Sequence, residues 1–172
     1  MPRRQPLPRL WLITDERQGD ALWPALERLP RGAGIVFRHY AVAAQTRYAL
    51  FARVRRIARR RGLMLIAAGP QLPAADGCHG RRGQGVRTAS VHDLRELRAA
   101  ERAGADLVFL SPVFATRSHP GARTLGPVRF GMIARAARIP VIALGGVDAA
   151  KARRLGGLGA YGWAAIDAWA GA

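Results

Sequence analysis

Short apolar segments alternate along the chain with longer amphipathic ones. Helical spacing of apolar residues predicts helices over residues 20–29, about 45–61, 93–103, near 127–137 and 149–155, with a short one ending at Trp169. Apolar runs predict strands over residues 10–14, 35–38, 63–67, 77–79, 86–89, 107–110, 141–144 and 160–164. Eight strands joined by right-handed crossovers form a (β/α)8 TIM barrel, and we expect residues 1–172 to fold as one such domain.

The predicted barrel is short of residues in one place. The span from Leu63 to Gly85 must hold two strands and their connections, although a βαβ unit normally takes about 30 residues or more. We therefore expect a barrel trimmed around its third and fourth βα units, with loops near residues 70–75 and 81–85 in place of helices. An open, doubly wound sheet is the alternative fold.

Polar residues gather where the predicted strands end. Gly145 and Gly146 follow a buried strand, where backbone N–H groups can meet an anion such as phosphate, although the pair can equally be a plain turn. The chain's four histidines each follow a predicted strand, which in a barrel places them on the C-terminal face, where barrel enzymes do their chemistry. Their spacing matches no metal-ligand motif, so we expect proton transfer and anion binding rather than a metal site. These histidines are His39, His79, His92 and His119.

The chain is strongly basic, with 28 Lys and Arg residues against 11 Asp and Glu and a formal charge of +17. Lys151 is its one lysine, and the arginines are densest over residues 53–61. There Leu50, Val54, Ile57 and Ala58 form an apolar stripe at helical spacing. This pattern favours a solvated outer helix, and no nucleic-acid-binding motif accompanies it. We therefore do not expect a nucleic-acid partner.

Composition also bears on location. No apolar run approaches the roughly 20 residues that span a bilayer, and the first residues lack the apolar core of a signal peptide. A single cysteine, Cys78, fits a reducing compartment and a small core residue. We expect a cytoplasmic protein with no membrane partner, and the sequence leaves open whether it forms a homo-oligomer.

Four segments, taken in order, resemble the thiamine phosphate synthase/TenI family. They read LWLITD (10–15), SVH (90–92), GADLVFLSPVFATRSHPGARTLG (104–126) and IPVIALGGV (139–147). The resemblance covers most of the chain and implies a (β/α)8 barrel that acts in thiamine biosynthesis.

The resemblance implies two alternative reactions. Synthases join a pyrimidine diphosphate to a thiazole phosphate and need Mg²⁺, held near acidic residues after the third and fourth strands. Here those positions read Ala-Ala-Gly (67–69) and Gly-Arg-Arg-Gly (80–83), and the lysine of the sixth loop is replaced by His119. Mg²⁺ is expected only under this synthase alternative, and no other cofactor is predicted.

TenI-type members instead tautomerise a thiazole carboxylate phosphate, moving a proton within the ring. The resemblance makes His92 the acid/base, although His92 can also merely cap the following helix. It makes Arg38 the residue that orients the substrate and His119 a further active-site group. A barrel that binds phosphorylated thiazole without catalysis is the remaining alternative. The expected substrate- and phosphate-binding residues are Ser90, Ser111, Thr116, Ser118, Gly145, Gly146, Gly162, Trp163 and Ala164.

Overall fold

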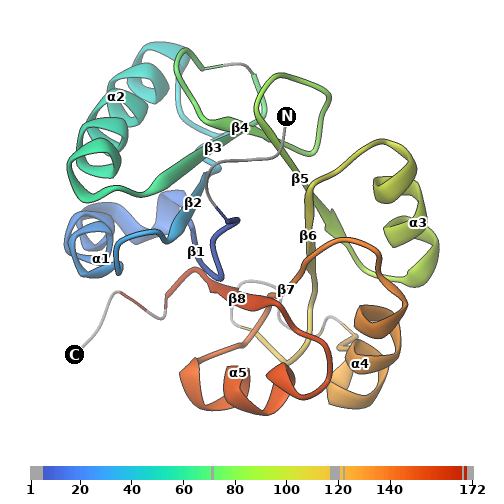
Figure 1. The fold of residues 1–172 in the computed structure, drawn as a ribbon. Coiled ribbons are helices and arrows are strands. Elements are labelled where there is room, and N and C mark those ends of the chain that lie inside the picture. Colours follow the sequence, from blue (N-terminus) through green and yellow to red (C-terminus); the bar gives the residue numbers. More distant parts are fainter. Residues whose placement is uncertain (1–5, 71, 117–120, 122, 168, 170–172) are drawn as a thin grey trace.

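The strands of the protein close into a parallel barrel. The computed structural model describes residues 6–70, 72–116, 121, 123–167 and 169. Eight parallel strands pair in chain order, and β1 pairs with β8 (Figure 1). The predicted barrel is thus confirmed, and the open sheet is excluded. The strands are β1 (Leu10–Ile13), β2 (Gly34–Phe37), β3 (Met64–Ala68), β4 (Gly77–His79), β5 (Val86–Val91), β6 (Leu107–Leu110), β7 (Val141–Ala143) and β8 (Gly162–Ala165).

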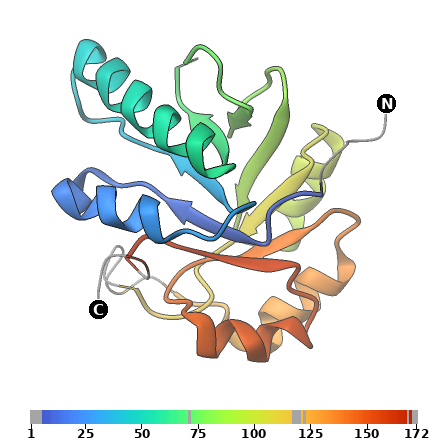
Figure 2. The same ribbon diagram turned by 60° about the vertical axis from the view of Figure 1, so that its left-hand side comes forward.

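The helices cover only part of the barrel. The α-helices are α1 (Leu22–Arg28), α2 (Ala44–Arg61), α3 (Leu94–Arg102), α4 (Gly126–Ala136) and α5 (Ala149–Gly156). Helices α1 and α2 lie side by side on one flank, and α3, α4 and α5 cover the other (Figures 1 and 2). The connections from β3 to β4 and from β4 to β5 are loops without a helix in the described part of the chain, which confirms the trimmed barrel.

Alternation along the strands separates two layers of the core. Trp11, Ile13, Val36 and Phe109 face the barrel interior, where Trp11 and Phe109 pack edge to face with ring centroids 5.4 Å apart. Their sequence neighbours face outwards against the helices, as Leu12 does on the α1–α2 flank. Burial on both faces explains why the strands read as continuous apolar runs.

Loops take the place of the two absent helices. Leu72, in the connection from β3 to β4, is 3% exposed and packs beneath α2 with the rest of that core. After β4, the chain folds back over Cys78, whose thiol donates to the Arg81 carbonyl at 3.3 Å. Cys78 is buried, as expected of a small core residue. These loop contacts, together with α2, cover the outer faces of β3 and β4 where the two helices are absent.

Helix α2 is the solvated outer helix predicted from its arginines. Val54, Ile57 and Ala58 are buried against the barrel, while Arg56 and Arg59 are exposed. The helix ends at Gly62, whose left-handed conformation (φ 65°) allows its N–H to bond back to the last turn. In the described chain no helix is both long and apolar enough to cross a membrane.

The structure departs from the predicted elements at both ends of the chain. The first helical segment begins earlier than predicted, as a 3-10 helix (Glu16–Ala21), because Asp15 caps it and Gly19 then breaks the turn before α1. Strand β8 begins at Gly162 rather than at residue 160. The short helix predicted up to Trp169 is wrong for the residues described there, since 166, 167 and 169 are not helical.

Candidate functional site

A cavity of about 430 Å³ opens at the carboxyl ends of the strands. Inner-layer side chains such as Ile13, Val36 and Phe109 form its floor, and the polar groups stand at its rim. None of the described residues that line it is acidic. It is lined by Ile13, Val36, Arg38, Tyr40, His79, Ser90, His92, Phe109, Ser111, Pro112, Thr116, Leu144, Gly145 and Ile166.

Arg38 supplies a fixed positive charge to this cavity. It follows β2 directly, and its backbone N–H donates to the Thr14 hydroxyl at 3.0 Å. The pKa of Asp15 is lowered mainly by Arg17 and that of His79 mainly by burial, and the charge of Arg38 adds a smaller lowering to both. A cation at the rim of an apolar cavity suits an anionic ligand, as predicted for this residue.

His92 stands at the rim with its ring held by a carboxylate. Its side chain is 57% exposed, and its Nδ1 lies 2.8 Å from the Glu96 carboxylate, which also accepts from the His92 backbone N–H. Asp93 is the residue that caps α3 with its side chain, at 2.8 Å from the Glu96 N–H. The ring of His92 is therefore not the helix cap, and no hydrogen bond among the described residues occupies its Nε2.

His79 lies deeper in the same cavity, at the end of β4. Its Nδ1 is 2.9 Å from the Thr88 hydroxyl and its Nε2 is 3.2 Å from the Ser90 hydroxyl. Burial and, to a smaller extent, the charge of Arg38 lower its pKa to about 4. The imidazole is thus neutral near pH 7. Sequence reasoning noticed this histidine but did not select it, because its partners on β5 depend on strand register.

Of the hydroxyl residues expected to bind the substrate, three line the cavity. Ser90 lies inside β5, which extends two residues beyond its predicted end, and faces the cavity. Ser111 and Thr116 line the cavity from the segment after β6. The expected residues Ser118 and His119 lie outside the described residues, so their placement stays a prediction.

Gly145 and Gly146 turn the chain after β7 at positive φ, 93° and 61°. A Cβ atom on Gly145 would lie 2.8 Å from Pro112 Cα, and one on Gly146 would lie 2.3 Å from the Ala115 carbonyl oxygen. The turn therefore packs directly against the segment after β6, and only glycine fits it. A second hollow of about 300 Å³ adjoins the cavity here and also reaches residues 147, 148 and 165–167.

Lys151 is a neighbour of this turn that sequence reasoning did not select. Its ammonium donates to the Gly146 carbonyl at 2.9 Å and pairs with the Asp148 carboxylate at 3.0 Å. The Lys151 side chain and backbone lower the pKa of Asp148, which caps α5. The one lysine thus lies beside the glycine turn and braces it.

Gly162, Trp163 and Ala164, expected to bind phosphate, lie within β8, and none of them lines the cavity or the hollow beside the glycine turn. Gly162 lies at the amino end of the strand, where an added Cβ would meet the Arg9 carbonyl oxygen at 1.9 Å. Trp163 stacks on Trp169 and Ala164 is buried in the inner layer. Residues 166 and 167 are the ones that reach the mouth from this strand.

His39 follows β2 at the carboxyl end of the barrel, as predicted, but its side chain does not line the cavity. This residue is 5% exposed and faces away from the barrel interior, with its ring stacked on Phe37 at 4.8 Å. Its Nδ1 is 3.0 Å from the Thr14 hydroxyl, and its carbonyl accepts from Arg47 Nε at 2.8 Å. Burial lowers its pKa. Strand alternation explains the difference, since Arg38 points inwards and His39 outwards.

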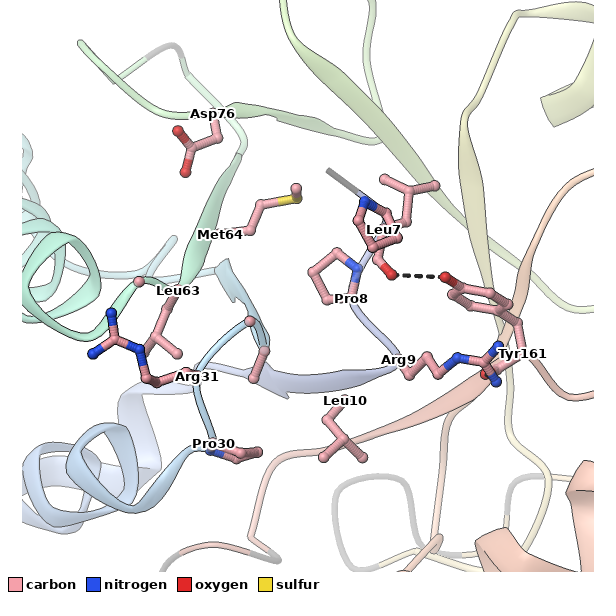
Figure 3. A pocket seen from close by; sticks show the side chains of 14 residues that line it. Leu7, Pro8, Arg9, Leu10, Pro30, Arg31, Leu63, Met64, Asp76 and Tyr161 are labelled. Carbon is pink, nitrogen blue, oxygen red and sulfur yellow. Dashed lines mark hydrogen bonds between the residues drawn. The ribbon is translucent and has the colours of Figure 1, made fainter. Parts of the chain in front are cut away.

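A larger hollow, about 870 Å³, lies at the opposite end of the barrel (Figure 3). Its polar groups bond the chain's own backbone: the Tyr161 hydroxyl donates to the Leu7 carbonyl at 2.8 Å, and the Asp76 carboxylate accepts from the Leu65 N–H at 2.7 Å. Arg9 stacks over the Tyr161 ring. Tyr161 and Arg9 fasten residues 6–9 to the barrel, and Asp76 fastens the β3–β4 connection to β3. We therefore assign this end of the barrel to stability and the carboxyl end to function.

The residues at the mouth do not suit a bound magnesium diphosphate. β3 ends in alanines, β4 ends at His79, and nearby Asp15 is paired with Arg17, which lowers the Asp15 pKa to about 2. Within the described chain, no group of three or more His, Cys, Asp or Glu side chains is arranged to hold a metal ion. We derive no step through Mg²⁺.

Comparison with known proteins agrees with the fold and identifies the family. A family model described as thiamine monophosphate synthase matches residues 84–169. A protein of Aquifex aeolicus that carries the provisional name thiamine-phosphate synthase 2 is 32% identical, over 94% of this chain and 97% of its own. The thiamine-phosphate synthase of Chloroflexus aurantiacus is 30% identical, over 93% and 84%.

A solved structure agrees as well. The thiamine phosphate pyrophosphorylase of Pyrococcus furiosus superposes with a TM-score of 0.80 at 26% identity, over 95% of this chain and 88% of that one. Three findings lead to one conclusion: the barrel, the family-model match from residue 84 onwards, and the relatives that span nearly the whole chain. The chain belongs to the thiamine phosphate synthase/TenI family.

Proposed function

We propose that the protein is a TenI-like thiazole tautomerase that binds a phosphorylated thiazole at the carboxyl end of its barrel. The observation that carries this proposal is the composition of the cavity: one arginine, two histidines and several hydroxyl groups, with no acidic residue among the described lining. Such a cavity suits an anionic ring compound whose reaction needs proton transfer and no metal-bound diphosphate.

His92 is the proposed acid/base. A tautomerase must remove a proton from one ring position and return it to another, and imidazole is the side chain suited to both steps near neutral pH. Glu96 orients the ring through Nδ1, which leaves Nε2 to exchange the proton. Arg38 would hold the substrate carboxylate or ring, and His119 is proposed as a further group at this mouth.

The phosphate would bind beside the turn after β7. The backbone of Gly145 and Gly146, the hydroxyl groups of Ser111 and Thr116, and Ser118 are the proposed contacts. Ile166 also lines this hollow, whereas the Asp167 carboxylate there is not a proposed phosphate contact. Lys151 braces this turn through the Gly146 carbonyl at 2.9 Å, and its ammonium is paired with the Asp148 carboxylate.

Thiamine phosphate synthase activity is the second candidate, because the relatives that span most of the chain carry that name. The missing acidic residues after β3 and β4 argue against it. The third candidate, a barrel that binds thiazole phosphate without turnover, shares the same cavity.

One set of assays separates the three candidates. Turnover of thiazole carboxylate phosphate is measured for the wild type, His92→Ala and the exposed α2 control Arg56→Ala. Tautomerase function predicts turnover by the wild type and control, with a loss of about 100-fold or more in His92→Ala. Product formed from both synthase substrates and Mg²⁺ would establish the second candidate, and binding without turnover the third.

A further inference from the structure

Three uncharged side chains form a continuous path from the barrel interior to the cavity. Thr88 and Ser90 are two residues apart on β5 and so share its inner face. His79, on β4, is in register with Thr88, and its two ring nitrogens reach the two hydroxyl groups at 2.9 and 3.2 Å. Thr88 is 2% exposed, whereas Ser90 lines the cavity.

The imidazole in the middle is fixed in place. Its ring packs edge to face against Phe109, with centroids 5.6 Å apart, and both nitrogens have hydroxyl partners. The titratable and charged groups that share its cavity are Arg38, His92 and Tyr40. Burial, with a smaller contribution from the charge of Arg38, lowers the pKa of this ring and keeps it neutral near pH 7.

A neutral imidazole has one N–H donor and one acceptor nitrogen, so the state of one nitrogen determines the state of the other. If the Thr88 hydroxyl donates to Nδ1, Nε2–H donates to Ser90, and the Ser90 hydroxyl can donate to a ligand. If Nδ1–H donates to Thr88, the Ser90 hydroxyl donates to Nε2, and its oxygen can accept from a ligand. Both arrangements keep the two ring nitrogens hydrogen-bonded.

We propose that Thr88, His79 and Ser90 form an uncharged hydrogen-bond relay that positions the Ser90 hydroxyl and lets it donate to, or accept from, the ring of a bound heteroaromatic anion. The inference rests on the proposed function for its ligand class. A tautomerase meets one ring in two protonation patterns, and a contact of adjustable polarity serves both. No proton passes to the ligand through the relay, so Thr88 and His79 are positioning residues.

The first test reads the relay without any turnover. In ¹⁵N-histidine-labelled wild-type protein at pH 7, we expect the His79 ring to show one protonated nitrogen, assigned with a His79→Gln variant. Thr88→Val, which keeps the side-chain shape and removes the hydroxyl, should change the tautomer populations of His79, and Thr88→Ser should keep them. A charged His79 at pH 7, or populations unchanged in Thr88→Val, would overturn the relay.

The second test uses thiazole carboxylate phosphate as the probe. By calorimetry and turnover, Thr88→Val should bind the probe within about twofold of the wild type while kcat falls about tenfold, and Thr88→Ser should recover kcat. Equal kcat in all three proteins would refute the positioning role. A wild type without turnover would instead refute the proposed function, and the relay would then be judged on the nitrogen shifts.

Discussion

Arg47, on α2, stabilises the region where β3 and β4 are not followed by helices. The side chain leaves α2 and is only 6% exposed. Its guanidinium donates to three carbonyl groups: His39 at 2.8 Å, Ala68 at 2.5 Å and Pro70 at 3.3 Å. These carbonyls follow β2, end β3 and begin the β3–β4 loop. One buried cation thus ties together the part of the mouth that has no covering helix.

We predict that Arg47→Met lowers the free energy of unfolding by about 3 kcal/mol. A hydrogen bond from a charged group contributes roughly 1.5–3 kcal/mol net. The bonds to His39 and Ala68 are buried, while Pro70 is exposed and its bond long, so two bonds carry most of the effect. Arg47→Met also removes the desolvation penalty of the buried guanidinium, which offsets part of the loss of these two hydrogen bonds. Arg47→Lys should recover little, because an ammonium does not have the guanidinium's planar, multi-donor geometry.

The assay is urea unfolding followed by tryptophan fluorescence, with Arg56→Met, exposed on the same helix, as the matched control. The control should remain within about 0.5 kcal/mol of the wild type. A loss below about 1 kcal/mol for Arg47→Met, or equal losses in both variants, would refute the assignment of Arg47 as the clamp of this region.

Three further predictions concern the mouth. The pKa of His79 is about 4 in the folded state against an ordinary 6.5, so the unfolded chain binds the proton first as the pH falls. Between pH 7 and pH 5 the wild type should therefore lose about 2 kcal/mol of stability relative to His79→Gln, measured by urea unfolding at each pH. A parallel pH dependence in both proteins would contradict this. Gly146→Ala, with positive φ and a Cβ 2.3 Å from a carbonyl oxygen, should cost about 2 kcal/mol or more by the same assay, and a neutral effect would disprove the close approach. Glu96→Ala, which frees the His92 ring, should reduce turnover of thiazole carboxylate phosphate about tenfold, and an unchanged rate would remove Glu96 from the mechanism.

The sequence was informative wherever apolar runs were bounded by polar or turn residues. β4 and β6 match their predicted bounds, and the shortage of residues between β3 and β5 correctly indicated loops. β8 was misplaced because residues 160–165 are small or aromatic throughout and carry no internal boundary. Its start is set by pairing with the entry segment, where the Trp163 N–H donates to the Arg9 carbonyl at 2.8 Å.

The candidate site was only partly predictable, for a related reason. Arg38 and His92 were selected through the family resemblance, and both directly follow a strand. The role of His79 depends on its register with Thr88 across two strands. The burial of Arg47, on a helix whose other arginines are mostly exposed, depends on carbonyls from three segments. Such contacts are long-range, and neither spacing nor composition reveals them.

The central claim is that His92 exchanges protons with a thiazole phosphate held at the carboxyl end of the barrel. Its most direct test is the turnover of thiazole carboxylate phosphate by the wild type and by His92→Asn, with binding measured in both. The account predicts that the wild type turns over the compound and that His92→Asn binds it within a few-fold yet loses turnover by about 100-fold or more. Equal turnover in both proteins, or none in the wild type, would contradict it.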